Sequence, residues 1–168
     1  MLHVCSLSKL PETIAETGAK SLVTLINAEM AVPTPEGIRP DRHLFLAFND
    51  IAQPVDGLVP PSERHVEDFL AFVRAWDRQA PLVIHCWAGI SRSTAGAYVA
   101  ACALRPEADE YRLAALLREK SPSATPNTRI VAMGDKLLGR EGRMIDAIRG
   151  IGRGANAFEG SPFVMPID

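Results

Sequence analysis

The sequence lacks any long apolar run. None of its hydrophobic segments approaches the roughly eighteen consecutive apolar residues that a membrane-spanning helix needs. The first residues, 1–7, lack the basic segment and the longer apolar stretch of a signal peptide. We therefore expect neither export nor membrane anchoring. Repeats and low-complexity tracts are also absent, and the order of apolar segments favours strands that alternate with helices.

Cysteine is scarce. The chain has three cysteines, an odd number with no pairing framework, at Cys5, Cys86 and Cys102. Disulfide-poor sequences of this kind are typical of reducing compartments, where a catalytic thiolate survives. The predicted location is therefore the cytoplasm.

Neither sign of charge predominates. The 18 basic and 20 acidic residues give a net charge of −2, so no polyanion-binding surface is indicated and we expect no nucleic-acid partner. His3, His43 and His65 have no spacing typical of metal ligands, and we predict no metal site. At 168 residues the chain is long enough for one domain with a sizeable core.

The most informative stretch runs from residue 85 to residue 93 and reads His-Cys-Trp-Ala-Gly-Ile-Ser-Arg-Ser. It follows a short apolar run, 81–84, that predicts a buried strand, and it precedes a small-residue-rich segment, 94–104, that predicts a buried helix. Cys86 then lies at the end of a strand, beneath backbone N–H groups and the positive end of a helix dipole. This setting predicts an oxyanion site.

Several positions of this stretch have a chemical use. The reactive form of cysteine is the thiolate, which a helix N-terminus and a cation favour, so we expect Cys86 to be ionised near neutral pH. The forked guanidinium of Arg92 can hold two oxygens of a phosphate at once. Gly89 supplies the tight bend and lets an anion approach the backbone. From its position, the Ser93 hydroxyl is predicted to donate a hydrogen bond to the Cys86 sulfur. His85 is predicted to fix the loop through a hydrogen bond that does not involve the substrate.

The pattern His-Cys-x-Ala-Gly-x-Ser-Arg-Ser resembles the signature loop of the cysteine-dependent protein tyrosine phosphatases, closest to their dual-specificity branch. Seven of its nine positions are specified, and the looser resemblance extends over about residues 2 to 150. The resemblance implies a cysteinyl-phosphate intermediate at Cys86 and a phosphate held by Arg92, with no metal and no cofactor. It also implies that the backbone of the intervening loop binds phosphate, at Trp87, Ala88, Gly89, Ile90 and Ser91.

The resemblance further implies a general acid, an aspartate on a mobile loop that follows a strand. Two residues fit, Asp50 at the end of the apolar segment 43–48 and Asp56 farther along the same loop, and Asp50 is the first choice. Such an acid protonates the leaving oxygen. Pro54, Pro60, Pro61 and Gly57 give the loop stiff segments and one flexible joint, compatible with a lid.

Asn127 is a third candidate. It lies in a Pro-Asn pair that resembles the stretch following the signature loop in dual-specificity phosphatases, where the asparagine braces the phosphate loop. An ordinary helix N-cap is the equal alternative. Arg129, two residues later, either adds positive charge near the site or is solvated.

The predicted fold class is α/β, a single domain with a central, mostly parallel sheet flanked by helices and the phosphate loop between a strand and a helix. Residues 1–154 are assigned to this domain and residues 155–168 to a tail that either packs as an extended segment or frays. The predicted strands are 2–7, 21–27, 43–48 and 81–84. The predicted helices are 11–18, 62–78, 94–104, 106–120, one that follows Asn127, and 141–149.

The function that these observations favour is hydrolysis of phosphomonoesters in a phosphorylated protein or peptide. Phosphotyrosine is the first choice of substrate, with phosphoserine and phosphothreonine as the alternative. Lipid phosphatases of the superfamily that this sequence resembles tend to carry lysines between the cysteine and the arginine of the loop. No lysine lies between Cys86 and Arg92, so the resemblance ranks phosphoinositides below protein substrates. Trp87 either forms an apolar wall for an aryl ring or packs beneath the loop. The sequence does not predict an oligomeric state.

Two other classes of function stay open at this point. One is a module that binds phosphopeptides without hydrolysing them. The other is rhodanese-like or arsenate-reducing chemistry on the same Cys-x5-Arg loop, which needs no general acid. A protective disulfide between Cys5 and Cys86 is a further hypothesis.

Overall fold

The computed structural model describes all 168 residues and is built around a sheet of short apolar strands. These strands are β1 (Leu2–Ser6), β2 (Ser21–Ile26), β3 (His43–Ala47), β4 (Leu82–Cys86) and β5 (Phe163–Met165). Their order is β3-β2-β4-β1-β5, with β1 to β4 parallel and β5 antiparallel to β1. β2 and β4 are buried along their whole length because both faces of the sheet are covered. The predicted α/β fold with a mostly parallel sheet is confirmed.

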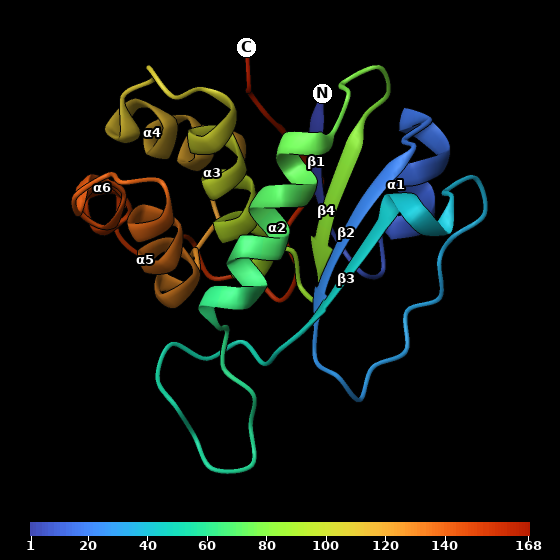
Figure 1. Cartoon of the computed structure of the whole chain (residues 1–168), viewed down its shortest axis with the longest axis horizontal. Coiled ribbons are helices and arrows are strands. Elements are labelled where there is room, and N and C mark those ends of the chain that lie inside the picture. The colour runs from blue at the N-terminus through green and yellow to red at the C-terminus, as the bar shows by residue number, and fades with distance from the viewer.

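Helices cover the two faces unequally (Figure 1). α1 (Leu10–Thr17) packs alone on one face, over a cluster of seven buried residues. The other face carries α2 (Glu63–Ala75) and α3 (Arg92–Leu104), with α4 (Glu110–Lys120), α5 (Thr128–Leu137) and α6 (Arg143–Ile151) outside them. This side holds the main core of 33 buried residues. The central helix α3 has small residues at most positions, so it can approach the sheet and its neighbouring helices closely.

Several predicted helix boundaries differ from the structure by one or two residues, and two differ by three or more, each for a local reason. The helix predicted from Pro106 begins instead at Glu110, because the Asp109 side chain accepts a hydrogen bond from the Arg112 amide (2.9 Å) and caps the helix there. The helix predicted to reach residue 78 ends at Ala75. There the backbone of Trp76 is extended, and its indole N–H donates to the Ala80 carbonyl at 2.9 Å.

The C-terminal segment, residues 155–168, packs in extended form and does not fray. β5 pairs with β1, and the side chains of Met165 and Ile167 are buried in the main core. The sheet therefore gains its outermost strand from the end of the chain. No helix of the structure combines the length and the hydropathy needed to cross a membrane.

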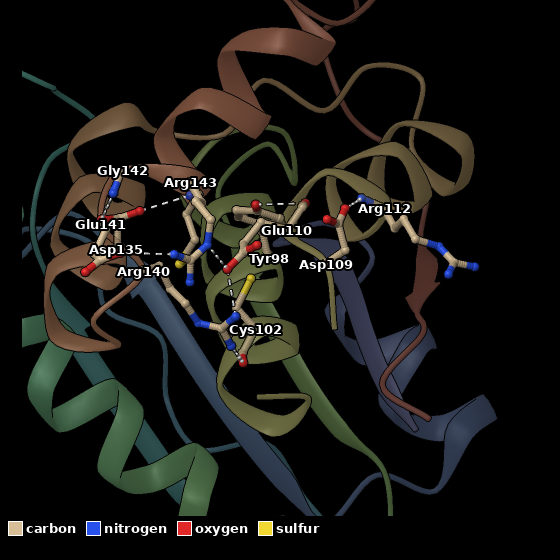
Figure 2. Close-up of polar contacts among 11 residues, drawn as sticks. Tyr98, Cys102, Asp109, Glu110, Arg112, Asp135, Arg140, Glu141, Gly142 and Arg143 are labelled. Atoms are coloured by element: carbon tan, nitrogen blue, oxygen red, sulfur yellow. Dashed lines mark hydrogen bonds and ion pairs between the residues drawn. The ribbon is translucent and has the colours of Figure 1, made fainter. Parts of the chain in front are cut away.

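A buried ionic network joins the start of α4 to the start of α6 (Figure 2). Glu110 is only 4% exposed, and its carboxylate accepts from Arg140 (2.7 Å) and Arg143 (3.1 Å). Arg140 also donates to the Cys102 carbonyl of α3 at 2.8 Å. Burial by itself raises the pKa of Glu110, but hydrogen bonds to its own backbone and to the two arginines outweigh burial and hold that pKa below its ordinary value.

We expect Glu110→Gln to lower the free energy of unfolding by about 3 kcal/mol at neutral pH, because it leaves the buried Arg140 charge uncompensated. Urea denaturation measures this. Since the pKa of Glu110 is lowered on folding, its stabilisation is present above the unfolded value of about 4.3 and is lost as the pH falls through the folded value. The difference between wild type and variant therefore shrinks in acid.

The matched control is Glu63→Gln, which removes a carboxylate from an exposed pair with Lys136. This variant should unfold at the wild-type urea concentration. Equal denaturation midpoints for wild type and Glu110→Gln at neutral pH would contradict a structural role for the buried network.

Candidate active site

The predicted phosphate loop lies between β4, which ends at Cys86, and α3, which begins at Arg92. Gly89 makes the turn with a φ of +71°, a left-handed conformation that favours glycine. A Cβ atom at this position would also lie 2.9 Å from the Ser6 backbone nitrogen. The loop therefore packs tightly against the end of β1, and glycine is required for two separate reasons.

The Cys86 side chain lies at the base of this loop and is only 2% exposed. Its Sγ atom accepts from the Gly89 amide at 3.3 Å and lies 3.1 Å from the Ser93 hydroxyl. The amides of the remaining loop residues donate to no acceptor within the protein; these residues are Trp87, Ala88, Ile90 and Ser91. Successive backbone N–H groups in a turn that lack acceptors are the donors from which anion-binding concavities are built.

Arg92 completes the site with a buried cation, 6% exposed, that forms no ion pair. Its Nη1 donates to the Asn27 side chain (2.7 Å) and to the Phe48 carbonyl (2.8 Å), which follow β2 and β3. Its buried Nε has no hydrogen-bond partner. One edge of the guanidinium is thus anchored, and the Nε donor is available to an anion.

The two candidate acids lie in different surroundings. Asp50 accepts from the Ser91 hydroxyl (2.8 Å) and from the Asn127 amide (2.9 Å), so its carboxylate lies against the phosphate loop. Asp56 is exposed, and the loop between β3 and α2 to which it belongs extends away from the body of the protein (Figure 1). The loop is closed at its base by two hydrogen bonds between Asn49 and Val59, 2.7 and 2.9 Å long.

Asn127 both caps a helix and contacts the site, so the two alternatives for it are compatible. Its side-chain oxygen accepts from the first amides of α5, at 3.1 and 3.0 Å, while its side-chain amide donates to Asp50 and to the Ile51 carbonyl. Its backbone amide donates to the Ser91 carbonyl at 3.2 Å. Arg129 is half-buried and donates to the Pro61 carbonyl at 2.7 Å, which fixes the far end of the Asp50 loop.

A chain of hydrogen bonds through His43, Thr24 and His85 supports the phosphate loop on its buried side. His85 is fully buried, and burial lowers the pKa of its imidazole to about 4, so the ring is neutral. Its Nε2 lies 2.7 Å from the Thr24 hydroxyl, which in turn lies 2.8 Å from His43. Its Nδ1 faces the Cys86 carbonyl at 3.4 Å. Since a carbonyl only accepts, Nδ1 carries the proton and Nε2 accepts from Thr24.

Comparison with known proteins agrees with this geometry. The family described as "Tc-R-P: Polymorphic toxin system, DSP-PTPase phosphatase" matches residues 7–108, more than half of the chain, including the whole phosphate loop. The chain belongs to this DSP-PTPase family. It is a cysteine-dependent protein phosphatase, and the resemblance predicted from residues 85–93 is confirmed. No curated protein sequence matches it.

Solved phosphatases share the fold of this DSP-PTPase at low sequence identity. Cydia pomonella PTP-2 phosphatase is 17% identical with a TM-score of 0.63, and the match covers 80% of this chain and 84% of the other. DUSP15 is 15% identical with a TM-score of 0.65 and 89% of each chain covered. Human DUSP28 is 18% identical with a TM-score of 0.61, and 90% and 95% are covered. The binding-module and rhodanese-like alternatives are not favoured.

The structure decides against one of the two alternatives for Trp87 and against the hypothesis of a disulfide at Cys5. Trp87 does not pack beneath the loop: it is 45% exposed, and its ring meets Phe158 edge to face with centroids 5.5 Å apart. Cys5 packs under α1, on the sheet face opposite Cys86, so a disulfide between them requires movement of the backbone. Burial also raises the pKa of the Cys5 thiol to about 12.

A cleft of about 630 Å³ opens beside the phosphate loop of the DSP-PTPase. Asp50, Ile90 and Ser91 line it together with residues 153 and 155–158, which follow α6. Sequence reasoning missed this second group, because nothing in a glycine-rich segment after the last helix indicates a return to the site. No cluster of three or more His, Cys, Asp or Glu side chains in the structure could hold a metal ion.

We expect Asn127→Asp to separate the two roles of this residue. Aspartate keeps an oxygen that caps α5, so the variant should unfold within about 1 kcal/mol of wild type. It loses the amide that donates to Asp50 and places a like charge there, so kcat should fall roughly tenfold and its pH profile should shift. Steady-state kinetics and urea denaturation measure the two effects.

The control is Asp109→Ala, which removes the cap of α4 away from the site. This variant should lose stability and keep its kcat. A wild-type pH profile and kcat for Asn127→Asp would show that the contact with Asp50 has no catalytic consequence.

Proposed function

We propose that this DSP-PTPase hydrolyses phosphotyrosine in proteins and peptides, with Cys86 as nucleophile, Arg92 and the loop amides as the phosphate site, and Asp50 as general acid. The observation that carries the proposal is the buried Arg92 guanidinium, which has no carboxylate partner and an unpaired Nε beside the Cys86 loop. A buried cation without a counter-charge favours binding of an anion.

The proposed chemistry has two steps. In the first, the Cys86 thiolate attacks phosphorus, the bond from phosphorus to the tyrosine oxygen breaks, and that oxygen takes the proton of Asp50. In the second, the Asp50 carboxylate takes a proton from water, the resulting hydroxide attacks phosphorus, and the P–S bond breaks. Inorganic phosphate leaves and the thiolate is restored. The Ser93 hydroxyl, 3.1 Å from Sγ, stabilises the sulfur while it carries negative charge.

The phosphate loop and its surroundings favour an aryl phosphate on a protein. The apolar rings of Trp87 and Phe158 are exposed beside the loop, where they suit an aromatic leaving group and its flanking peptide. Phosphoserine and phosphothreonine are the weaker alternative. We place the protein in the cytoplasm, because its three cysteines are all free and a catalytic thiolate needs a reducing compartment.

Variants on one loop test the assignment of the acid. We expect Cys86→Ser to abolish turnover of an aryl phosphate. Asp50→Asn should lower kcat/KM, which reports the first step only, by about 10²–10⁴-fold with phenyl phosphate. The loss should be much smaller with p-nitrophenyl phosphate, because nitrophenolate leaves readily without a proton. Stopped assays of released phosphate measure both substrates.

Asp56→Asn is the matched control, since it makes the same change of charge on the same loop. We expect wild-type rates from it with both substrates. Equal losses in the two variants, or a larger loss in Asp56→Asn, would overturn the role of Asp50. Turnover that survives in Cys86→Ser would overturn the mechanism as a whole.

A further inference from the structure

The stretch 153–158, which follows α6, forms one wall of the cleft that opens beside the phosphate loop. Five of the nine residues that line the cleft come from it, namely Arg153, Ala155, Asn156, Ala157 and Phe158. The others belong to the phosphate loop, to the Asp50 position and to Thr125. A substrate that places its phosphate on the Cys86 loop therefore meets this segment next.

The first part of the wall is fixed to the protein on both sides of Arg153. Before it, the Gly152 carbonyl accepts from the Arg118 guanidinium at 2.7 Å, and Arg118 also donates to the Ala124 carbonyl at 2.8 Å. After it, the Gly154 amide donates to Thr125 Oγ1 at 3.2 Å. The backbone that carries Arg153 is thus held against residues 124–125, and the Thr125 amide donates to the Ile90 carbonyl of the phosphate loop at 2.9 Å.

The second part of the wall is fixed to the phosphate loop itself. The Gly160 amide donates to the Ala88 carbonyl at 2.8 Å, and a Cβ atom on Gly160 would lie 2.7 Å from the Gly89 carbonyl oxygen. The Glu159 carboxylate accepts from the hydroxyls of Ser6 and Ser8. These contacts give residues 153–160 a defined position beside the loop, so they can recognise a substrate with little ordering cost.

Arg153 is the cation that this wall brings to the cleft. Its side chain is exposed and takes part in none of the ion pairs or side-chain hydrogen bonds of the structure. Asp50 is the other charged residue that lines the cleft, and it is held by Ser91 and Asn127. With the scissile phosphate on Arg92, Arg153 remains as a second positive charge for another part of the substrate.

We propose that Arg153 is a specificity-determining residue that binds a carboxylate of the substrate, so that the enzyme prefers phosphotyrosine flanked by acidic residues. The proposal rests on the function proposed above. A carboxylate matches the forked donors of one guanidinium. A second phosphate is the weaker candidate, because the cleft supplies no further cation to balance a dianion.

Kinetics of Arg153→Gln on matched substrates test the proposal. The substrates are a phosphotyrosine peptide with flanking glutamates, the same peptide with glutamines, the same peptide with a neighbouring phosphoserine, and p-nitrophenyl phosphate. We expect kcat/KM for the glutamate peptide to fall roughly fivefold, mainly through KM, as for a partly exposed ion pair. The glutamine peptide and p-nitrophenyl phosphate should be turned over at wild-type rates.

Arg149→Gln is the control, because Arg149 is an exposed arginine of α6 that pairs with Asp146 and does not line this cleft. It should behave as wild type with all substrates. An equal loss on the glutamate and glutamine peptides, or no loss on either, would overturn the proposal. A loss confined to the phosphoserine peptide would replace the carboxylate with a second phosphate.

Binding to the Cys86→Ser variant separates this proposal from the proposed function. By calorimetry, the glutamate peptide should bind Cys86→Ser more tightly than the glutamine peptide does, and adding Arg153→Gln should remove the difference. If wild type hydrolyses none of the substrates, the proposed function fails while this measurement still tests Arg153. If hydrolysis is normal but both peptides bind equally, only the role of Arg153 fails.

Discussion

A buried arginine without a carboxylate partner is the constraint on which the site depends. The Arg92 guanidinium is desolvated at the start of α3, and two neutral acceptors, the Asn27 side chain and the Phe48 carbonyl, hold one of its edges. Burying a charge in this way is costly, and neutral hydrogen bonds offset only part of the cost. The parallel sheet makes the arrangement feasible, since it brings the carboxyl ends of β2, β3 and β4 together at the phosphate loop. A bound phosphate dianion would supply the missing counter-charge.

Backbone groups and small polar side chains fix the conformation of the phosphate loop around this cation. Glycine at position 89 allows the turn to pack on β1, and the neutral His85 orients the Cys86 carbonyl from the buried side. Asn127 ties three parts together, because it caps α5, donates to Asp50 and bonds to the loop backbone. The C-terminal segment packs over the remaining side, and its Gly160 amide bonds directly to the loop. The site is thus preorganised by contacts from segments that lie far apart in the sequence.

The sequence predicted the strand, loop and helix around Cys86 because their signals are local: an apolar run, a glycine and a helix of small residues. It could not predict the surroundings that depend on distant segments. β5 has only three residues, too few to show the alternation of apolar and polar side chains that identifies a strand. Its pairing with β1 depends on burial of Met165 and Ile167 in a core that distant segments form. The helix start at Pro106 was mistaken because Asp109 competes as a cap. The residues next to Trp87 and Arg153 in the sequence do not indicate that Trp87 is exposed or that Arg153 lines the cleft.

The most direct test of the account is a crystal structure of the wild-type protein with orthovanadate, which mimics the five-coordinate phosphorus of the transition state. The account predicts vanadium bonded to Cys86 Sγ, with its equatorial oxygens accepting from Arg92 Nε and from the loop amides, and an apical oxygen facing Asp50. Vanadate bound elsewhere, or bound at the loop with Arg92 Nε still unpaired, would contradict it.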